Sequence, residues 1–132
     1  MIARPRLLVV DACEETREVL RTSFGPLTDI FEASRIDDGL ALARSESPDV
    51  VVLDLECEPA RGATIAEGFR DVTTDNPPDV VVLGTARQAR QSEFEVALER
   101  GQFLRKPYHY GPLIRKIEEL LGSHERSVRR AA

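Results

Sequence analysis

The residues that could do chemistry in this 132-residue sequence follow short apolar runs, and they offer two carboxylates, a hydroxyl and an ammonium. In chain order they are Asp11, Asp54, Thr85 directly after Gly84, and Lys106. Two aspartates suit a hard divalent cation such as Mg²⁺, which prefers oxygen ligands and keeps several waters. An aspartate beside such a cation can attack phosphorus, while an ammonium and a hydroxyl bind the phosphoryl oxygens. The set therefore favours a phosphoryl-transfer site.

Each of these residues also has an ordinary structural interpretation. A single aspartate after a strand is usually a turn or helix-capping residue, and a Lys-Pro pair is usually part of a loop. Cys13 and Cys57 are interpreted as inert small residues, and His109 and His124, which lack ligand spacing, as solvated side chains. The functional interpretation depends on the fold bringing the four groups to one place.

The elements that must position these groups alternate along the chain between apolar runs and helical segments. Strands are predicted at residues 7–10, 29–33, 50–53, 80–83 and 102–105. Helices are predicted at residues 14–24, 36–45, 63–73, 92–100 and 112–121, the last ending at Gly122. Five successive β-α units predict a doubly wound, flavodoxin-like α/β fold, with a parallel sheet of strand order 2-1-3-4-5 and helices on both faces. Ligands of such sheets bind beyond the carboxyl ends of the strands, where the four groups fall.

Composition limits the classes of protein to which the chain can belong. A net charge of −5, from 18 basic and 23 acidic residues, disfavours direct nucleic-acid binding. No apolar stretch approaches the roughly 18 residues of a transmembrane helix, and the N-terminus does not resemble a signal peptide. We therefore expect a cytoplasmic protein without a membrane partner. Residues 1–122 are predicted to form one domain, and residues 123–132 an Arg-rich tail or linker.

Several short motifs then occur in the order found in one protein family. They are Leu8-Val9-Val10-Asp11 with Arg17, Pro48-Asp49-Val50-Val51-Val52-Leu53-Asp54-Leu55 with Gly62, Thr85-Ala86, Ala97-Leu98-Glu99-Arg100-Gly101 and Lys106-Pro107. With these motifs, which extend over nearly the whole predicted domain, the sequence resembles the receiver domain of two-component response regulators.

The resemblance implies a role for each residue of the site. Asp54 matches the residue that accepts a phosphoryl group from a histidine kinase, and Lys106 matches the lysine that contacts the phosphoryl oxygens. Mg²⁺ would be held by Asp11, by Asp54 and by the backbone carbonyl of Glu56.

The resemblance also implies a switch and a partner surface. Thr85 matches the hydroxyl residue and Phe103 the aromatic residue of the switch. The last strand and the last helix form the face on which such domains pair or meet partners, and here it carries Phe103, Tyr108, Arg115 and Lys116. Any homodimer, and any contact with a histidine kinase or another signalling protein, is expected to use this face.

Ala12 is the main departure from the family pattern, because the family usually has a second acid at this position. We therefore expect an incomplete acidic pocket that binds Mg²⁺ weakly, unless a nearby glutamate such as Glu14 or Glu56 replaces the missing carboxylate. The hydroxyl position is also ambiguous by one residue. Counting back from Lys106 favours Gly84, whereas the Thr-Ala pair favours Thr85.

Three functions stay open at this point. The first is an atypical receiver domain that accepts phosphate on Asp54 in a phosphorelay. The second is a degenerate receiver that acts as a phosphorylation-independent interaction module. The third, and least favoured, is a small phosphohydrolase with an aspartate nucleophile, since Glu56 stands where that signature needs an aspartate and no glycine-rich phosphate loop is present. We therefore do not expect an enzyme.

Overall fold

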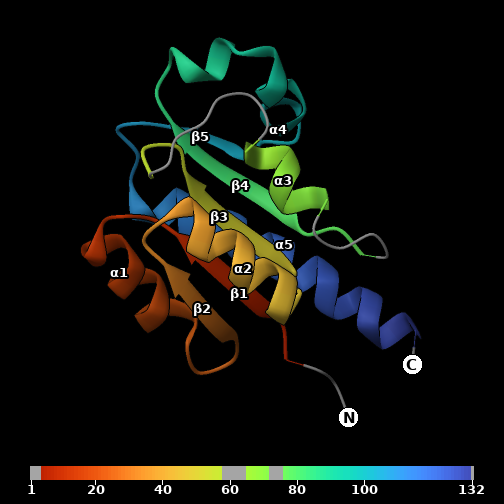
Figure 1. Cartoon of the computed structure of the whole chain (residues 1–132). Helices are drawn as coiled ribbons and strands as arrows, with labels where there is room; N and C mark the ends of the chain where they lie inside the picture. Colours follow the sequence, from red (N-terminus) through yellow and green to blue (C-terminus); the bar gives the residue numbers. More distant parts are fainter. Residues whose placement is uncertain (1–3, 58–64, 72–75, 132) are drawn as a thin grey trace.

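The computed structural model describes residues 4–57, 65–71 and 76–131 of the chain, and its centre is a five-stranded parallel sheet (Figure 1). The strands are β1 (Arg6–Val10), β2 (Asp29–Ala33), β3 (Val50–Asp54), β4 (Asp79–Gly84) and β5 (Phe103–Arg105). Their order across the sheet is β2-β1-β3-β4-β5, and all four neighbouring pairs are parallel. The predicted topology is confirmed.

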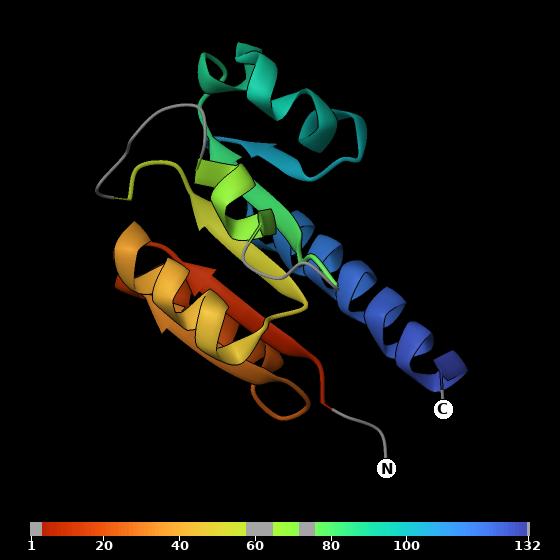
Figure 2. The same ribbon diagram turned by 45° about the vertical axis from the view of Figure 1, so that its right-hand side comes forward.

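Helices cover both faces of this sheet (Figure 2). They are α1 (Glu14–Phe24), α2 (Ile36–Glu46), α3 (Ile65–Asp71), α4 (Glu95–Glu99) and α5 (Tyr110–Ala131), with short 3₁₀ turns η2 (Gln88–Arg90) and η3 (Ser92–Phe94) before α4. Helices α1 and α5 lie on one face, and α2, α3 and α4 lie on the other. The doubly wound arrangement is therefore also confirmed.

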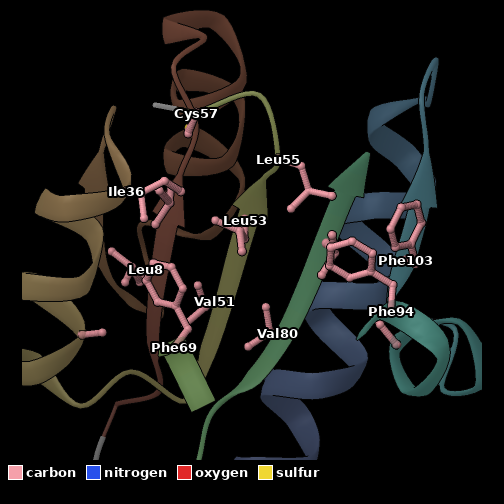
Figure 3. Packing of buried hydrophobic residues seen from close by; sticks show 14 of the residues in the cluster. Leu8, Ile36, Val51, Leu53, Leu55, Cys57, Phe69, Val80, Phe94 and Phe103 are labelled. Carbon is pink, nitrogen blue, oxygen red and sulfur yellow. The ribbon is translucent and has the colours of Figure 1, made fainter. Parts of the chain in front are cut away.

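Two hydrophobic cores follow from the alternation of side chains along each strand. Leu8, Val51, Val80 and their neighbours face α2, α3 and α4, as Figure 3 shows. Leu7, Val50 and Val81, each one residue away along its strand, face α1 and α5. Because both faces of the central strands are covered, those strands need unbroken apolar runs, and this requirement made them recognisable in the sequence.

The largest difference from the predicted elements concerns the last helix. We expected it to end at Gly122, but α5 continues to Ala131. The segment expected at residues 92–100 begins as the 3₁₀ turn η3 and becomes α-helical only at Glu95. Gly62, one of the motif residues, lies outside the described residues. Among the described residues, no helix combines the length and apolar character that crossing a membrane requires.

Candidate functional site

The fold brings Asp11, Asp54 and Lys106 together at the carboxyl edge of the sheet. Asp54 is the last residue of β3, while Asp11 follows β1 and Lys106 follows β5. Backbone hydrogen bonds hold the two flanking positions: the Asp11 N–H donates to the Ala33 carbonyl at 3.0 Å, and the Lys106 N–H donates to the Gly84 carbonyl at 2.8 Å. The three residues are therefore fixed by the sheet rather than by mobile loops.

Asp54 is the centre of the site. Its Oδ1 accepts a hydrogen bond from the Lys106 ammonium at 2.6 Å and another from the Glu56 backbone N–H at 2.9 Å. Its side chain is only 11% exposed, so this ion pair is largely shielded from water. A charge-assisted hydrogen bond of this kind is stronger than a neutral one. Lys106 thus holds the carboxylate in one orientation.

Asp11 is buried beside Asp54, and its two oxygens differ in their surroundings. Oδ1 accepts a hydrogen bond from the Cys13 backbone N–H at 2.9 Å. Oδ2 is buried and has no hydrogen-bond donor among the described residues. Burial, and after it the neighbouring Asp54 carboxylate, raise the pKa of Asp11 to about 6, against the lowering effects of the Cys13 N–H and of Lys106. A raised pKa within the aspartate pair was predicted from the expected closeness of the two carboxylates.

Lys106 contacts two acids. Its Nζ also lies 3.3 Å from Oε2 of Glu56, whose side chain is 67% exposed. Burial works to lower the pKa of Lys106, but the hydrogen bond and charge of Asp54, followed by those of Glu56, outweigh it and raise the pKa. Lys106 therefore stays an ammonium at neutral pH and is available to neutralise anionic oxygens.

The donor set suits a hard cation but is sparse. Ala12 is exposed and contributes no side-chain oxygen, and Glu14 is paired with Arg17 at 2.7 Å rather than with the site. Within the part of the chain that the structure describes, no three acidic, histidine or cysteine side chains form a metal-binding group. The unpaired Oδ2 of Asp11 beside Asp54 fits a cation that prefers oxygen, with water completing its shell.

Gly84 and Thr85 occupy different positions at the end of β4. Gly84 is the last strand residue and pairs with Arg105 of β5. Thr85 begins the following turn, where its Oγ1 accepts a hydrogen bond from the Gln88 N–H at 3.1 Å and its own N–H donates to Gln88 Oε1 at 2.8 Å. This reciprocal pair is a capping box. The Thr85 hydroxyl therefore has a structural role in the turn, and the strand end itself carries no side chain.

Phe103 fills the space beside that glycine. A Cβ atom on Gly84 would lie 2.9 Å from Phe103 Cζ and 2.8 Å from Leu55 Cδ1. Phe103 is 8% exposed, and its ring centroid lies 5.4 Å from that of Phe94. Figure 3 shows the two rings packed together. The Phe103 side chain therefore belongs to the core in this conformation, and its contribution to a partner face stays a prediction.

The other residues predicted on the partner face have different surroundings. Arg115 is exposed on α5. Lys116 is tied to the end of α4, since its Nζ donates to the Arg100 carbonyl at 3.0 Å. Tyr108 packs edge-on against Tyr110, with ring centroids 6.1 Å apart. Of the four residues, Arg115 alone is exposed.

The two cysteines lie near the site without forming a disulfide. Cys13 is exposed and directly precedes α1, and Cys57 is buried. Burial, and then the nearby Asp54 and Asp11 carboxylates, raise the pKa of the Cys57 thiol to about 11. A protonated, buried thiol is a poor nucleophile, which agrees with the interpretation of Cys57 as an inert residue.

The sequence analysis missed the contacts made by two polar residues, Gln88 and His124. Gln88 completes the turn after β4, and its Thr-x-x-Gln spacing from Thr85 is the capping-box signal that could have revealed it. His124 was expected to be solvated but lies between two carboxylates at the opposite edge of the sheet. No local pattern marks it, because its partners are distant in the sequence.

Comparison with known proteins agrees with this fold. No family model matches the chain. The KDP operon transcriptional regulatory protein KdpE of Escherichia coli is 30% identical over 121 residues, which cover 89% of this chain and 52% of KdpE. A protein-glutamate methylesterase/protein-glutamine glutaminase of Rhodopseudomonas palustris is 31% identical over 101 residues, which cover 74% of this chain and 27% of that protein. The chain thus spans about half the length of the first relative and about a quarter of the second.

A solved structure gives the same result for the fold. The signal receiver domain of an HD domain-containing protein from Pseudomonas fluorescens superposes with a TM-score of 0.73 at 20% identity, covering 100% of this chain and 97% of that domain. The sheet order, the aspartates and lysine at its carboxyl edge and these similarities together place the chain in the receiver-domain family of two-component response regulators.

Proposed function

We propose that this receiver domain accepts a phosphoryl group on Asp54 from a phosphohistidine of a histidine kinase. The observation that supports this function best is the contact of 2.6 Å between Lys106 Nζ and Asp54 Oδ1 beside the buried Asp11. It combines a fixed carboxylate nucleophile, an ammonium that neutralises phosphoryl oxygens and a second carboxylate suited to a cation.

Transfer on these residues needs no general base. Since Oδ1 of Asp54 takes two hydrogen bonds, we assign the attack on phosphorus to Oδ2. The new O–P bond forms as the P–N bond to the kinase histidine breaks, and the electron pair of that bond stays on the imidazole. Lys106 then neutralises charge on the transferred group.

Asp11, Asp54 and the backbone carbonyl of Glu56 would hold Mg²⁺, which supplies further neutralisation of the phosphoryl oxygens when bound. With Ala12 in place of an acid, we expect this binding to be weak. The direct test of the function is to incubate the protein with a small-molecule phosphodonor and Mg²⁺ and to measure added phosphate mass on Asp54. A chain that gains no phosphate, or gains it elsewhere, contradicts the proposal.

Restoring the missing acid with Ala12→Asp is expected to tighten Mg²⁺ binding at least tenfold, or about 1.4 kcal/mol. The reason is that a hard cation is held more tightly by an additional anionic oxygen at the exposed position next to Asp11. Isothermal titration of both proteins with Mg²⁺ measures the change, and Ala12→Asn, which adds similar volume without charge, is the control. Equal affinity of Ala12→Asp and wild type would show that position 12 does not face the cation.

A second function is favoured by the end of β4. Gly84 offers no hydroxyl, the Thr85 hydroxyl is used by the Gln88 turn, and Phe103 is already buried beside the glycine. A receiver with these features can present one fixed surface whether or not Asp54 carries phosphate. Backbone NMR signals of β4 and β5 that stay unchanged on phosphorylation would support this phosphorylation-independent module, and large shifts would exclude it.

Gly84→Ala tests the packing on which this second function depends. The new methyl would meet Leu55, Gln88 and Phe103 at under 3 Å, so we expect a loss of about 1 to 3 kcal/mol in the free energy of unfolding and a displaced Phe103 ring. Urea unfolding followed by circular dichroism measures the loss. Gly68→Ala, whose methyl would be 3.7 Å from its nearest neighbour, is the matched control. Equal stability of the two variants would contradict the tight contact.

We also propose that self-association, if the domain pairs, uses the face formed by β5 and α5. Arg115 is an exposed cation of this face, whereas Lys116 holds α5 to α4 and is unsuitable as a surface probe. Arg115→Glu is expected to weaken a dimer severalfold in sedimentation velocity, because it reverses a charge at the contact. Arg44→Glu on α2 is the control. Unchanged association in Arg115→Glu would exclude this surface.

A further inference from the structure

Helix α5 contains a glycine in its interior. Gly122 lies between Tyr110 and Ala131, the ends of the helix, and glycine in a helix interior costs about 1 kcal/mol relative to alanine. Packing does not require it, since nothing lies within 4 Å of the place where its Cβ would be. Only residues 123–131 follow, and helices much shorter than about 12 residues are marginal by themselves. The end of α5 therefore needs an anchor beyond Gly122.

His124 is the side chain that contacts the sheet beyond this glycine. Its Nε2 is 3.0 Å from Oδ2 of Asp79, and its Nδ1 is 3.7 Å from Oδ1 of Asp49. The imidazole is 16% exposed, so both ion pairs are partly shielded from water. Asp79 begins β4 and Asp49 directly precedes β3, at the edge of the sheet opposite the phosphorylation site. Figure 2 shows α5 extending beyond this edge.

The two carboxylates are held in place by the sheet. Oδ2 of Asp49 accepts the Arg6 backbone N–H at 2.8 Å, and Oδ1 of Asp79 accepts a hydrogen bond from Gln102 Nε2 at 3.4 Å. Among the side chains that the structure describes, other charged groups nearby are Arg100, which acts on Asp79, and the Arg6 guanidinium, whose own partner is Glu46 at 3.9 Å. The surroundings of His124 are therefore dominated by two fixed negative charges.

The protonation state of His124 determines how favourable its contacts with the two carboxylates are. An imidazolium has an N–H on each ring nitrogen and can face both carboxylates with a donor. A neutral imidazole has one N–H, so its second nitrogen presents a lone pair to a carboxylate. Deprotonation thus converts one of two favourable contacts into a repulsive one.

We propose that His124, Asp49 and Asp79 form a proton-operated clasp that docks the part of α5 beyond Gly122 onto the sheet and releases it as the pH rises. It is a conformational device separate from phosphorylation. Gly122 is the weak point at which the released segment loses its helical structure.

The pH range of the clasp follows from the two partners. The hydrogen bond to Asp79 raises the pKa of His124 above its ordinary value near 6.5, although burial opposes this, while the charges of Asp49 and Asp79 add to the increase. Protonated His124 therefore stabilises the docked end of α5 fully below about pH 6.5. This stabilisation is lost as the pH rises through the pKa that His124 has in the folded state. The His124 hydrogen bond in turn lowers the pKa of Asp79. The contribution of ionised Asp79 to stability is therefore lost only as the pH falls through that lowered pKa. The clasp is closed in mildly acidic solution.

Amide hydrogen exchange of residues 118–131 in the full chain, measured from pH 5.5 to 8.5 and corrected for intrinsic rates, tests the proposal. We expect protection of these amides to be about fivefold lower at pH 8.5 than at pH 5.5, the size expected for losing one partly exposed ion pair. His124→Gln should be equally protected at both pH values. The chain has two histidines, so His109→Gln, at an exposed position, is the matched control and should behave as wild type. Constant protection in wild type, or a pH dependence that persists in His124→Gln, would overturn the clasp.

Gly122→Ala provides a second test that leaves every clasp residue in place. Removing the glycine should strengthen the helix itself, so the end of α5 should stay protected at pH 8.5 and the pH dependence should shrink. The same dependence as wild type would overturn the assignment of Gly122 as the point of release.

Discussion

Asp54→Asn is expected to abolish phosphoryl uptake, and this is the largest effect expected of any single change in the chain. The amide cannot act as the carboxylate nucleophile, and it no longer carries the charge that holds the Lys106 ammonium at 2.6 Å. Intact-protein mass spectrometry after incubation with phosphodonor and Mg²⁺ should show phosphate on wild type and none on the variant.

The matched control for this change is Asp38→Asn, which removes an exposed carboxylate on α2 and should be phosphorylated as wild type is. Equal uptake by Asp54→Asn and wild type would place the nucleophile elsewhere and overturn the assignment of the site. A partner that binds Asp54→Asn and unphosphorylated wild type equally well would instead favour the phosphorylation-independent module.

Asp54→Asn should have little effect on the free energy of unfolding. Asn at position 54 removes repulsion between two buried carboxylates, but it also removes the ion pair with Lys106, and these effects oppose each other. We therefore expect a change in the free energy of unfolding of under about 1 kcal/mol. A folded Asp54→Asn without phosphate uptake thus separates loss of chemistry from loss of structure.

The sheet and the centre of the site could be predicted from the sequence because each rests on a strong local pattern. Strands covered on both faces must be unbroken apolar runs, and the residues that end them must meet at one edge. Asp11, Asp54 and Lys106 could therefore be placed together before any coordinates were known. Their proximity follows from topology, and topology follows from the alternation of strands and helices.

The structure differs from the sequence-based expectations where tertiary contacts override a local sequence signal. Gly122 is a helix-stop signal by propensity, yet α5 passes through it, and the contacts of His124 with residues at the start of β3 and β4 lie just beyond. The sequence assigned Phe103 to a switch and a partner face, but it could not show that Gly84 leaves a space beside β4 that the ring fills. Neither partner is visible within a local sequence window.

Asp11→Asn is expected to stabilise the metal-free protein by about 2 kcal/mol at pH 7.5. Asp11 is 1% exposed, and its pKa is raised to about 6, first by burial and then by Asp54, so the folded state prefers the protonated side chain. One pKa unit corresponds to about 1.4 kcal/mol, and we reduce the full value because the Asp11 and Asp54 charges are coupled. The neutral amide keeps an oxygen for the Cys13 N–H and gains an N–H that can donate to Asp54.

The pH dependence of this difference identifies its cause. The pKa of Asp11 is higher in the folded state than in the unfolded state, so protonated Asp11 stabilises the folded protein. This stabilisation is fully present below the unfolded-state pKa near 4 and is lost as the pH rises through about 6. Wild type should therefore lose stability over this range relative to Asp11→Asn, and the two proteins should converge below pH 4. Urea unfolding at several pH values without Mg²⁺ measures the difference, with the exposed Asp38→Asn as control. An Asp11→Asn protein that is less stable than wild type at pH 7.5 would show that the buried Asp11 charge is compensated in the native state, and the acidic pocket would then not be strained without a cation.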